Sequence, residues 1–262
     1  MAEFPRITSR QHEIVRRFRE AAQREAEDTV VLDGEHLLSE ALRASVRVEI
    51  VLAALADGAH GALAARAQSA GAVVYDAVPA VIEAASPVRT PSGIVALARW
   101  SPSPLEAVLG GSDPFVVALC GVQDPGNVGS VIRSADALGA SGVLALDATA
   151  NPAGWKALRG AMGSTFRIPV AVSSVADALA AAGAAAWQIL ATVAQTGQPA
   201  HTVDLRRPSL LLLGSEGSGL DQAIVERATN RVSIPMRPGV NSLNVAATAA
   251  LLLYEARRQR TS

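Results

Sequence analysis

The sequence predicts an α/β protein of two domains, the second built on a parallel sheet. Half of the 262 residues are hydrophobic, which is enough to bury a substantial core. In the second half, continuous apolar runs alternate with helical stretches, a pattern typical of a parallel sheet covered on both faces. A segment rich in proline and glycine, residues 101–113, separates that half from a smaller unit in which helical and extended patterns also alternate.

The first domain is expected at residues 1–103. The apolar residues Ile14, Val15 and Phe18 in a polar stretch predict its first helix, and β-branched runs predict its strands. The elements expected are helix 9–26, strand 29–32, helix 35–42, strand 46–52, helix 59–70 and strands 72–75 and 94–98. Residues 101–112 are expected to link the domains, with one helical turn at 105–109.

The second domain is expected at residues 112–262. Its elements are predicted as strand 115–120, helix 127–138, strand 143–146, helices 155–161 and 175–182, strand 188–193, strand 210–213, helix 220–227, strand 231–234 and helix 241–258. Asn127 is expected to cap the first of these helices. Asn241 or Ser242 is expected to cap the last one, with Asn244 in its first turn.

Several classes of protein and site are excluded by composition and motif. No run of eighteen apolar residues occurs and the N-terminus lacks a secretory signal, so we expect a cytoplasmic protein without a membrane segment. Cys120 is the single cysteine, and the four histidines lack zinc-site spacing, so no metal is expected. Dinucleotide, P-loop and serine-hydrolase fingerprints are absent from the sequence.

Three segments follow predicted strands of the second domain, at the edge where open α/β sheets bind ligands. Residues 121–133 combine turn chemistry with Arg133, an arginine in an otherwise apolar helix that needs a phosphate or carboxylate partner. Residues 214–220 carry three glycines, which let the backbone approach a ligand, with Glu216 among them. Residues 234–244 lead into the last helix and, taken alone, are a well-capped helix start.

Taken together, these segments resemble the SpoU (TrmH) family of RNA 2′-O-methyltransferases, within the SPOUT superfamily. The family motif Asn-x-Gly-x-x-x-Arg matches Asn127, Gly129 and Arg133. The motif Gly-Ser-Glu-Gly-x-Gly-Leu matches residues 214–220, and Ile-Pro-Met followed by Ser-Leu-Asn matches residues 234–244.

The resemblance covers residues 115–260 and extends more loosely to residues 7–9 and 31–38, which look like a small ribosomal-protein-like RNA-binding domain. It implies a Rossmann-like SPOUT domain whose C-terminal part forms a trefoil knot, a fold that general topology rules exclude. It also implies a homodimer with the active site at the subunit interface.

The resemblance implies S-adenosylmethionine as cofactor and a set of site residues. The residues implied to contact the cofactor, partly through their backbone, are Thr192, Gly214, Gly219, Ile234, Met236 and Leu243. The residues implied to carry catalysis are Arg133, Ser242 and Asn244, with Asn127 and Glu216 supporting the loops. Because a guanidinium stays protonated at ordinary pH, we expect Arg133 to anchor a phosphate and stabilise the developing alkoxide rather than act as a base.

RNA is the expected partner because only RNA offers a ribose 2′-hydroxyl. The net charge of −1 argues against binding over the whole surface but allows a local basic face. Candidate RNA contacts are Arg16, Arg17, Arg159 and Arg167, with a solvated arginine face as the alternative for the first two. Gly160 stands where family members often have a serine, so no substrate hydrogen bond is assigned there.

The expected target is 23S rRNA, with tRNA, or an rRNA site whose methylation confers antibiotic resistance, as alternatives. Two other classes of function stay open at this point. One is a catalytically inactive RNA-binding protein that keeps the fold. The other is a doubly wound nucleotide-binding enzyme with a small-molecule substrate.

Overall fold

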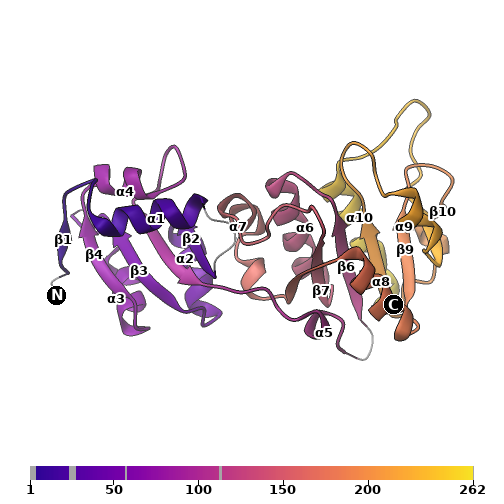
Figure 1. Cartoon of the computed structure of the whole chain (residues 1–262), viewed down its shortest axis with the longest axis horizontal. Coiled ribbons are helices and arrows are strands. Elements are labelled where there is room, and N and C mark those ends of the chain that lie inside the picture. The colour runs from indigo at the N-terminus through magenta and orange to yellow at the C-terminus, as the bar shows by residue number, and fades with distance from the viewer. Residues whose placement is uncertain (1–3, 24–27, 57, 112–113, 262) are drawn as a thin grey trace. The chain divides into compact units, whose positions relative to one another are not determined.

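The computed structural model describes residues 4–23, 28–56, 58–111 and 114–261 (Figure 1). These residues form two compact units. The first consists of the described residues up to Ser101 together with Ala153–Phe166. The second consists of Pro102–Pro152 and the described residues from Arg167 onward.

The first unit is a five-stranded mixed sheet in the order β1-β4-β3-β5-β2. Strands β1, β3 and β4 are parallel, whereas β5 runs antiparallel to both of its neighbours, β2 and β3. The elements are β1 (Arg6–Ile7), α1 (Glu13–Gln23), β2 (Thr29–Asp33), α2 (Glu35–Arg43), β3 (Val48–Ala53), α3 (Gly61–Ser69), β4 (Val73–Ala77), α4 (Pro79–Ala85) and β5 (Ile94–Arg99).

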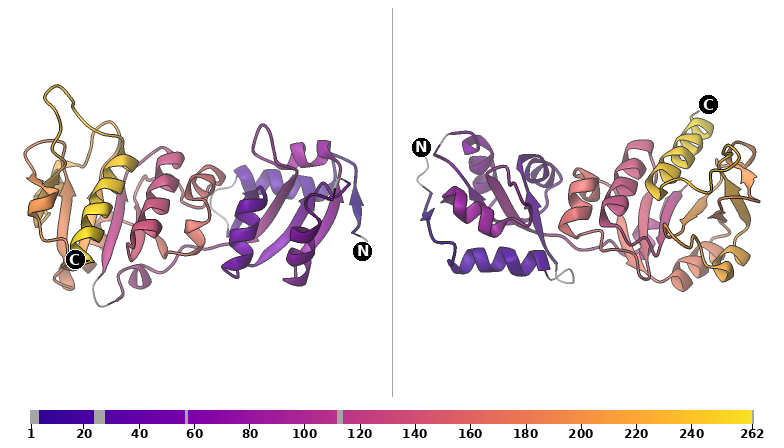
Figure 2. Two further views of the ribbon diagram at one scale, coloured as in Figure 1. Left: turned by 180° about the vertical axis from the view of Figure 1, so that it is seen from behind. Right: turned by 90° about the horizontal axis from the view of Figure 1, so that it is seen from above.

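Helices cover both faces of this sheet (Figures 1 and 2). α1 buries Ile14, Val15 and Phe18 on one face, where α4 also packs, and α2 and α3 pack on the other face. The sequence pattern names neither β1 nor α4. α4 has seven residues and begins at Pro79, whose fixed φ suits the first helical position but leaves little length for a periodic signal.

The core under α2 and α3 is completed by a helix from much later in the chain. α7 (Trp155–Ala161) buries Leu158 in this cluster, and Phe166, at the end of the short 3₁₀ helix Ser164–Phe166, packs against it. The sequence analysis places residues 155–161 in the second domain. A local pattern shows that a helix has an apolar face but does not show which sheet that face packs against.

The second unit is a seven-stranded sheet in the order β10-β12-β9-β11-β6-β7-β8, and every strand pair in it is parallel. This confirms the predicted parallel α/β architecture. Its elements are α5 (Leu105–Val108), β6 (Phe115–Cys120), α6 (Pro125–Leu138), β7 (Gly142–Leu146), β8 (Val170–Ser173), α8 (Val175–Ala184), β9 (Gln188–Thr192), β10 (Gln198–Pro199), the 3₁₀ helix Ala200–Thr202, β11 (Ser209–Leu213), α9 (Gln222–Glu226), β12 (Asn230–Ser233) and α10 (Val245–Arg260).

Helices cover both faces of the second sheet as well. α5, α8 and α9 pack on one face, and α6 and α10 lie side by side on the other (Figure 2). The sequence predicts a linker at 101–112. In the structure, however, α5 packs against β7 and β8, and its Val108 is fully buried, so the residues from Pro102 belong to the second unit.

Two predicted helix caps are wrong, each by three residues or fewer. α6 begins after Asp124, whose Oδ1 accepts a hydrogen bond from the backbone N–H of Asn127, so Asn127 lies within the first turn. α10 begins after Asn244, whose Oδ1 accepts from the N–H groups of Ala246 and Ala247. Aspartate, asparagine and serine are all strong helix caps, and each helix start has two or more of them within four residues, so the sequence did not show which one is the cap. The trefoil knot stays a prediction, because strand order alone does not define how the chain is threaded.

Candidate active site

The three motif segments meet near the strand at which the second sheet changes the direction in which successive strands are added. β6 lies between β7 and β11 in the sheet order. The helix that follows β6 covers one face and the helix that follows β11 covers the other. Such a reversal leaves a crevice beyond the carboxyl ends of the two strands, which is where open α/β sheets bind ligands.

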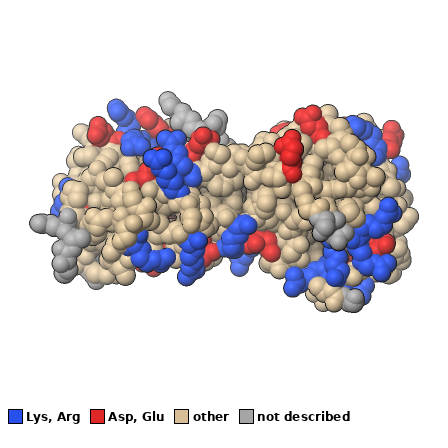
Figure 3. Space-filling view, turned by 90° about the horizontal axis from the view of Figure 1, so that it is seen from below, with Lys and Arg blue, Asp and Glu red and all other residues tan. Residues whose placement is uncertain are grey.

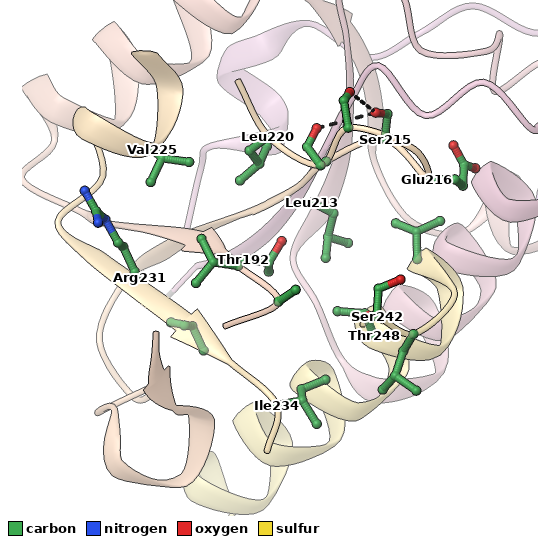
Figure 4. A pocket seen from close by; sticks show the side chains of 18 of the residues that line it. Thr192, Leu213, Ser215, Glu216, Leu220, Val225, Arg231, Ile234, Ser242 and Thr248 are labelled. Carbon is green, nitrogen blue, oxygen red and sulfur yellow. Dashed lines mark hydrogen bonds between the residues drawn. The ribbon is translucent and has the colours of Figure 1, made fainter. Parts of the chain in front are cut away.

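A cavity of about 480 Å³ lies beyond the carboxyl ends of β9, β11 and β12, on one side of this reversal (Figure 4). Its walls come from the loops after β9, β11 and β12 and from the start of α10. All six residues expected to contact a cofactor line it, namely Thr192, Gly214, Gly219, Ile234, Met236 and Leu243. Glu216 and Ser242 line it as well.

The loop after β11 closes tightly on itself. The N–H of Ser215 donates to the carbonyl of Gly219 over 3.2 Å, and the N–H of Gly219 donates back to Ser215 over 3.1 Å. Gly214 lies against the returning backbone so closely that a β-carbon there would be 2.2 Å from the carbonyl carbon of Gly219. No side chain fits at Gly214, so this glycine is required by the shape of the cavity wall.

Three side chains from the three motifs form a chain of hydrogen bonds, which we call the amide relay. Asn127 Nδ2 donates to Glu216 Oε1 over 2.8 Å, and Asn244 Nδ2 donates to Asn127 Oδ1 over 3.1 Å. Asn244 Oδ1 in turn caps α10. The relay therefore ties the start of α6, the glycine loop and the start of α10 together.

The helix cap fixes the direction of this relay. The N–H groups at the start of α10 require an oxygen from Asn244, so its amide nitrogen must face Asn127. Asn127 must then present its own oxygen to Asn244 and its nitrogen to Glu216. Glu216, as a carboxylate, only accepts hydrogen bonds, so all three residues agree with one orientation.

The remaining cavity residues differ in what they offer a ligand. The hydroxyl of Thr192 donates to the carbonyl of Leu212, so it is engaged by the neighbouring strand. Ser242 is exposed and faces the cavity near Thr248 (Figure 4). Arg231, which the sequence analysis did not single out, lines the cavity at the end away from Glu216. A lone exposed arginine in a short strand carries no sequence signal.

Arg133 lies outside this cavity. It is exposed on α6, and its side chain makes no hydrogen bond or ion pair within the described part of the chain. The structure therefore links Asn127, Glu216 and Asn244 by hydrogen bonds and places Glu216 and Ser242 at the cavity, whereas Arg133 neither lines the cavity nor bonds to the relay. Its guanidinium remains available for an external anion.

The arginines expected to contact RNA are all exposed, and three have partners in the chain. Arg167 contacts Asp136 over 2.8 Å, Arg17 lies 3.6 Å from Glu49, and Arg16 lies 3.8 Å from Glu20. Arg159 is exposed on α7. On the face shown in Figure 3, basic and acidic side chains are mixed over most of the surface, and basic side chains gather at the lower right.

Cys120, at the end of β6, is not a nucleophile. Burial, with a smaller contribution from the nearby carboxylate of Asp147, raises the pKa of its thiol to about 12. The thiol is therefore protonated at neutral pH.

The described residues include no group of three or more histidine, cysteine, aspartate or glutamate side chains that could hold a metal ion. Among the helices that the structure describes, none is both long and apolar enough to span a membrane.

Comparisons with known proteins agree with this architecture. Residues 114–254 match the model of the SpoU rRNA Methylase family. An uncharacterized tRNA/rRNA methyltransferase of Synechocystis is 32% identical, with 97% of this chain and 94% of that protein covered. The 23S rRNA (guanosine(2553)-2′-O)-methyltransferase RlmP of Bacillus subtilis is 32% identical, with 88% and 89% covered.

A crystal structure of an AdoMet-bound rRNA methyltransferase from Sinorhizobium meliloti superposes on the whole chain with a TM-score of 0.89. The two chains are 29% identical, and each is covered completely. With a family model matched over more than half of its length and relatives matched along nearly all of it, this chain belongs to the SpoU rRNA methylase family.

Proposed function

We propose that this chain is an S-adenosylmethionine-dependent methyltransferase that methylates a ribose 2′-hydroxyl of 23S rRNA in the cytoplasm. The observation that carries the proposal is the amide relay, which links the three family motifs by hydrogen bonds and reaches the cavity at Glu216. The name of the Bacillus subtilis relative supports the reaction and the RNA, and the AdoMet-bound structure supports the cofactor.

The cavity suits a nucleoside cofactor in size and lining. Its volume of about 480 Å³ lies within the range of about 300–1,000 Å³ that small-molecule sites occupy. Apolar walls from Leu213, Val225 and Leu252 suit an adenine ring, and the polar backbone around Gly214 suits a ribose or amino acid. Gly214, Ile234 and Leu243 would hold the cofactor through main-chain atoms, and Thr192 would do so without its engaged hydroxyl.

S-adenosylmethionine, when bound, supplies a methyl group already activated for displacement by an oxygen nucleophile. The residues of the chain must then position the ribose and exclude water. The amide relay holds the glycine loop against the start of α10, which keeps the cavity in one shape. Ser242, exposed at the cavity wall, would accept a hydrogen bond from the ribose hydroxyl and, as the ribose proton moves to its oxygen, release its own hydroxyl proton to water.

Arg133 is assigned to the RNA rather than to the cofactor. Its guanidinium is protonated at any ordinary pH and cannot accept a proton. Arg133 is exposed and does not line the cavity of its own chain. We therefore propose that it binds the phosphate beside a target ribose held by the other subunit of a dimer.

The proposed homodimer has a candidate surface on α10. Ala247, Leu251 and Tyr254 are exposed at helical spacing on this helix, with Leu251 48% and Tyr254 61% exposed. An apolar stripe of this kind on a surface helix is typical of an interface. α10 also packs on α6, the helix that carries Arg133, so a dimer through α10 would bring the arginine helix close to a second chain.

A catalytically inactive RNA-binding protein would not need this site. Such a protein is free to lose the relay residues, yet Asn127, Glu216 and Asn244 are present and hydrogen-bonded to one another. This favours an active enzyme over the inactive alternative.

The proposal is tested by incubating the protein with labelled S-adenosylmethionine and 23S rRNA that lacks 2′-O-methyl groups, then digesting the RNA to nucleosides. We expect label in one 2′-O-methylnucleoside, and none in tRNA or in deoxyribose substrates. Label in tRNA alone would reassign the substrate. The absence of transfer to any RNA, despite measured cofactor binding, would refute the proposed activity.

A further inference from the structure

A second cavity, in the first unit, has the character of a nucleotide-binding groove. It has a volume of about 650 Å³ and lies between α1 and the first residues of β3 and β4. The residues that matter for its chemistry are Ile14, Arg17, Arg47, Glu49, Val73 and Tyr75. We call it the β4 groove.

The wall formed by β4 is apolar and open. Val73 and Tyr75 point to the same side of the strand, as alternate residues do, and Val73 is 51% exposed. Strand β1 pairs only with Asp76 and Ala77, so within the described residues no strand lies beside the first part of β4 on that side. A half-buried tyrosine next to an exposed valine forms a surface on which a planar base can stack.

The charge of the groove favours an anion. Glu49 lies between two arginines, with its Oε1 3.0 Å from Arg99 Nε and its Oε2 3.6 Å from Arg17 Nη2. The Arg17 contact is longer than a hydrogen bond, and Glu49 Oε2 accepts no hydrogen bond from the described residues. The guanidinium of Arg17 therefore keeps donors for another partner.

Arg47 adds a charge that nothing in the described part of the chain neutralises. It is exposed at the groove, and its side chain makes no ion pair or hydrogen bond with any residue that the structure describes. Two arginines and two carboxylates line the groove, Arg17, Arg47, Glu13 and Glu49. Arg99 does not line it but pairs with Glu49, so these five side chains together carry one net positive charge. Arginine donors beside an aromatic wall are the combination that binds the phosphate and base of single-stranded RNA.

We propose that the β4 groove binds one unpaired nucleotide of the RNA substrate, with its base against Val73 and Tyr75 and its phosphate at Arg17 and Arg47. The inference rests on the proposed RNA substrate. It separates Arg17, which lines the groove, from Arg16, which does not. It places RNA recognition on the first unit at the ends where β3 and β4 begin.

Two variants and one control test the groove in the full-length protein. Arg47→Ala removes the unpaired guanidinium, and Val73→Glu places a charge on the stacking wall. Arg66→Ala removes an arginine of α3 that is also exposed but does not line the groove. The affinity for unmodified 23S rRNA and the KM and kcat of methyl transfer are measured for each, over a series of salt concentrations.

We expect Arg47→Ala and Val73→Glu to raise the Kd and KM for RNA about tenfold with kcat unchanged, and Arg66→Ala to match the wild type. Loss of one phosphate contact should also lower the slope of log affinity against log salt by about 1 in Arg47→Ala. Photocrosslinking with 4-thiouridine-substituted rRNA should label the peptide that contains Val73 and Tyr75.

Unchanged RNA affinity in both variants, with crosslinks only in other peptides, would overturn the proposal. The open edge of β4 would then be a candidate for pairing with a strand of another protein. This outcome is distinct from failure of the proposed function. A wild-type protein that transfers no methyl group to RNA refutes the activity, and RNA binding through the β4 groove is read independently by affinity and crosslinking.

Discussion

Replacing Asn244 with aspartate tests whether the direction of the amide relay matters for the cavity. The two side chains have the same shape, and aspartate caps a helix as well as asparagine does, so α10 should keep its start. The second carboxylate oxygen, however, replaces the Nδ2 that donates to Asn127 Oδ1 over 3.1 Å. Two acceptors then face each other.

Asn127 can rotate its amide to donate to the new carboxylate, but its oxygen would then face Glu216, 2.8 Å away in the present arrangement. One repulsive contact therefore remains in either orientation. Because Glu216 and Asn244 are exposed, we take the cost of this repulsive contact at about 1–2 kcal/mol. If cofactor binding requires the closed relay, this cost corresponds to a roughly five- to thirtyfold loss of affinity for S-adenosylmethionine.

The assay is cofactor affinity by calorimetry, with the melting temperature measured in parallel. Asn244→Ser is the matched comparison, because serine also caps a helix but lacks an opposing acceptor. We expect Asn244→Asp to bind S-adenosylmethionine more weakly than Asn244→Ser, with a melting temperature lowered by only about 2–8 °C, the shift that corresponds to about 1–2 kcal/mol. If the aspartate variant binds as well as the wild type, or better than the serine variant, the reasoning about relay direction is refuted.

Three further predictions concern the active site, and a fourth concerns the buried thiol. Arg133→Lys keeps the charge but loses the planar fork, so methyl transfer should fall about a hundredfold with cofactor affinity unchanged. Mixing Arg133→Ala with Ser242→Ala should restore about a quarter of wild-type activity if Arg133 acts across a two-fold dimer interface, and none if each chain works alone. Gly214→Ala should destabilise the fold by about 3 kcal/mol and abolish cofactor binding, as measured by thermal melts and calorimetry. Gly217 has open space around it, so Gly217→Ala should change neither the stability nor the cofactor affinity. The pKa of the Cys120 thiol is about 12 in the folded protein and near 9.0 in an unfolded chain. The free energy of unfolding should therefore fall as pH rises above about 9, because only the unfolded thiol then loses its proton. Denaturant titrations should show this decline in the wild type and not in a Cys120→Ala variant.

Most of the fold was predictable because its strands are short apolar runs that need little context. β6, β7 and β11 are buried on both faces, so nearly every position is apolar and their limits were predicted to within one residue. The short elements were missed for the opposite reason. β1 and β10 have two residues each and are held by a neighbouring strand rather than by their own pattern.

Most of the predicted site residues line the cavity or join the amide relay, but their geometry was not predictable, and their roles stay predictions. The motifs named Asn127, Glu216 and Asn244, yet spacing along the chain did not show that these side chains join in one relay or that Asn244 is the cap. The exposure of Arg133 also lay beyond sequence reasoning. Its apolar neighbours Val131 and Ile132 are buried, but a helix presents successive residues to different faces.

The position of α7 limits how this protein could be recombined with its relatives. The chain leaves the first unit at Ser101 and returns to it for Ala153–Phe166 before leaving again, so three peptide connections join the units. A chimera joined at residue 101 would take its first sheet from a relative but keep Leu158 of this chain, a residue that packs directly on that sheet. A working chimera would therefore have to inherit residues 153–166 from the same parent as its N-terminal hundred residues.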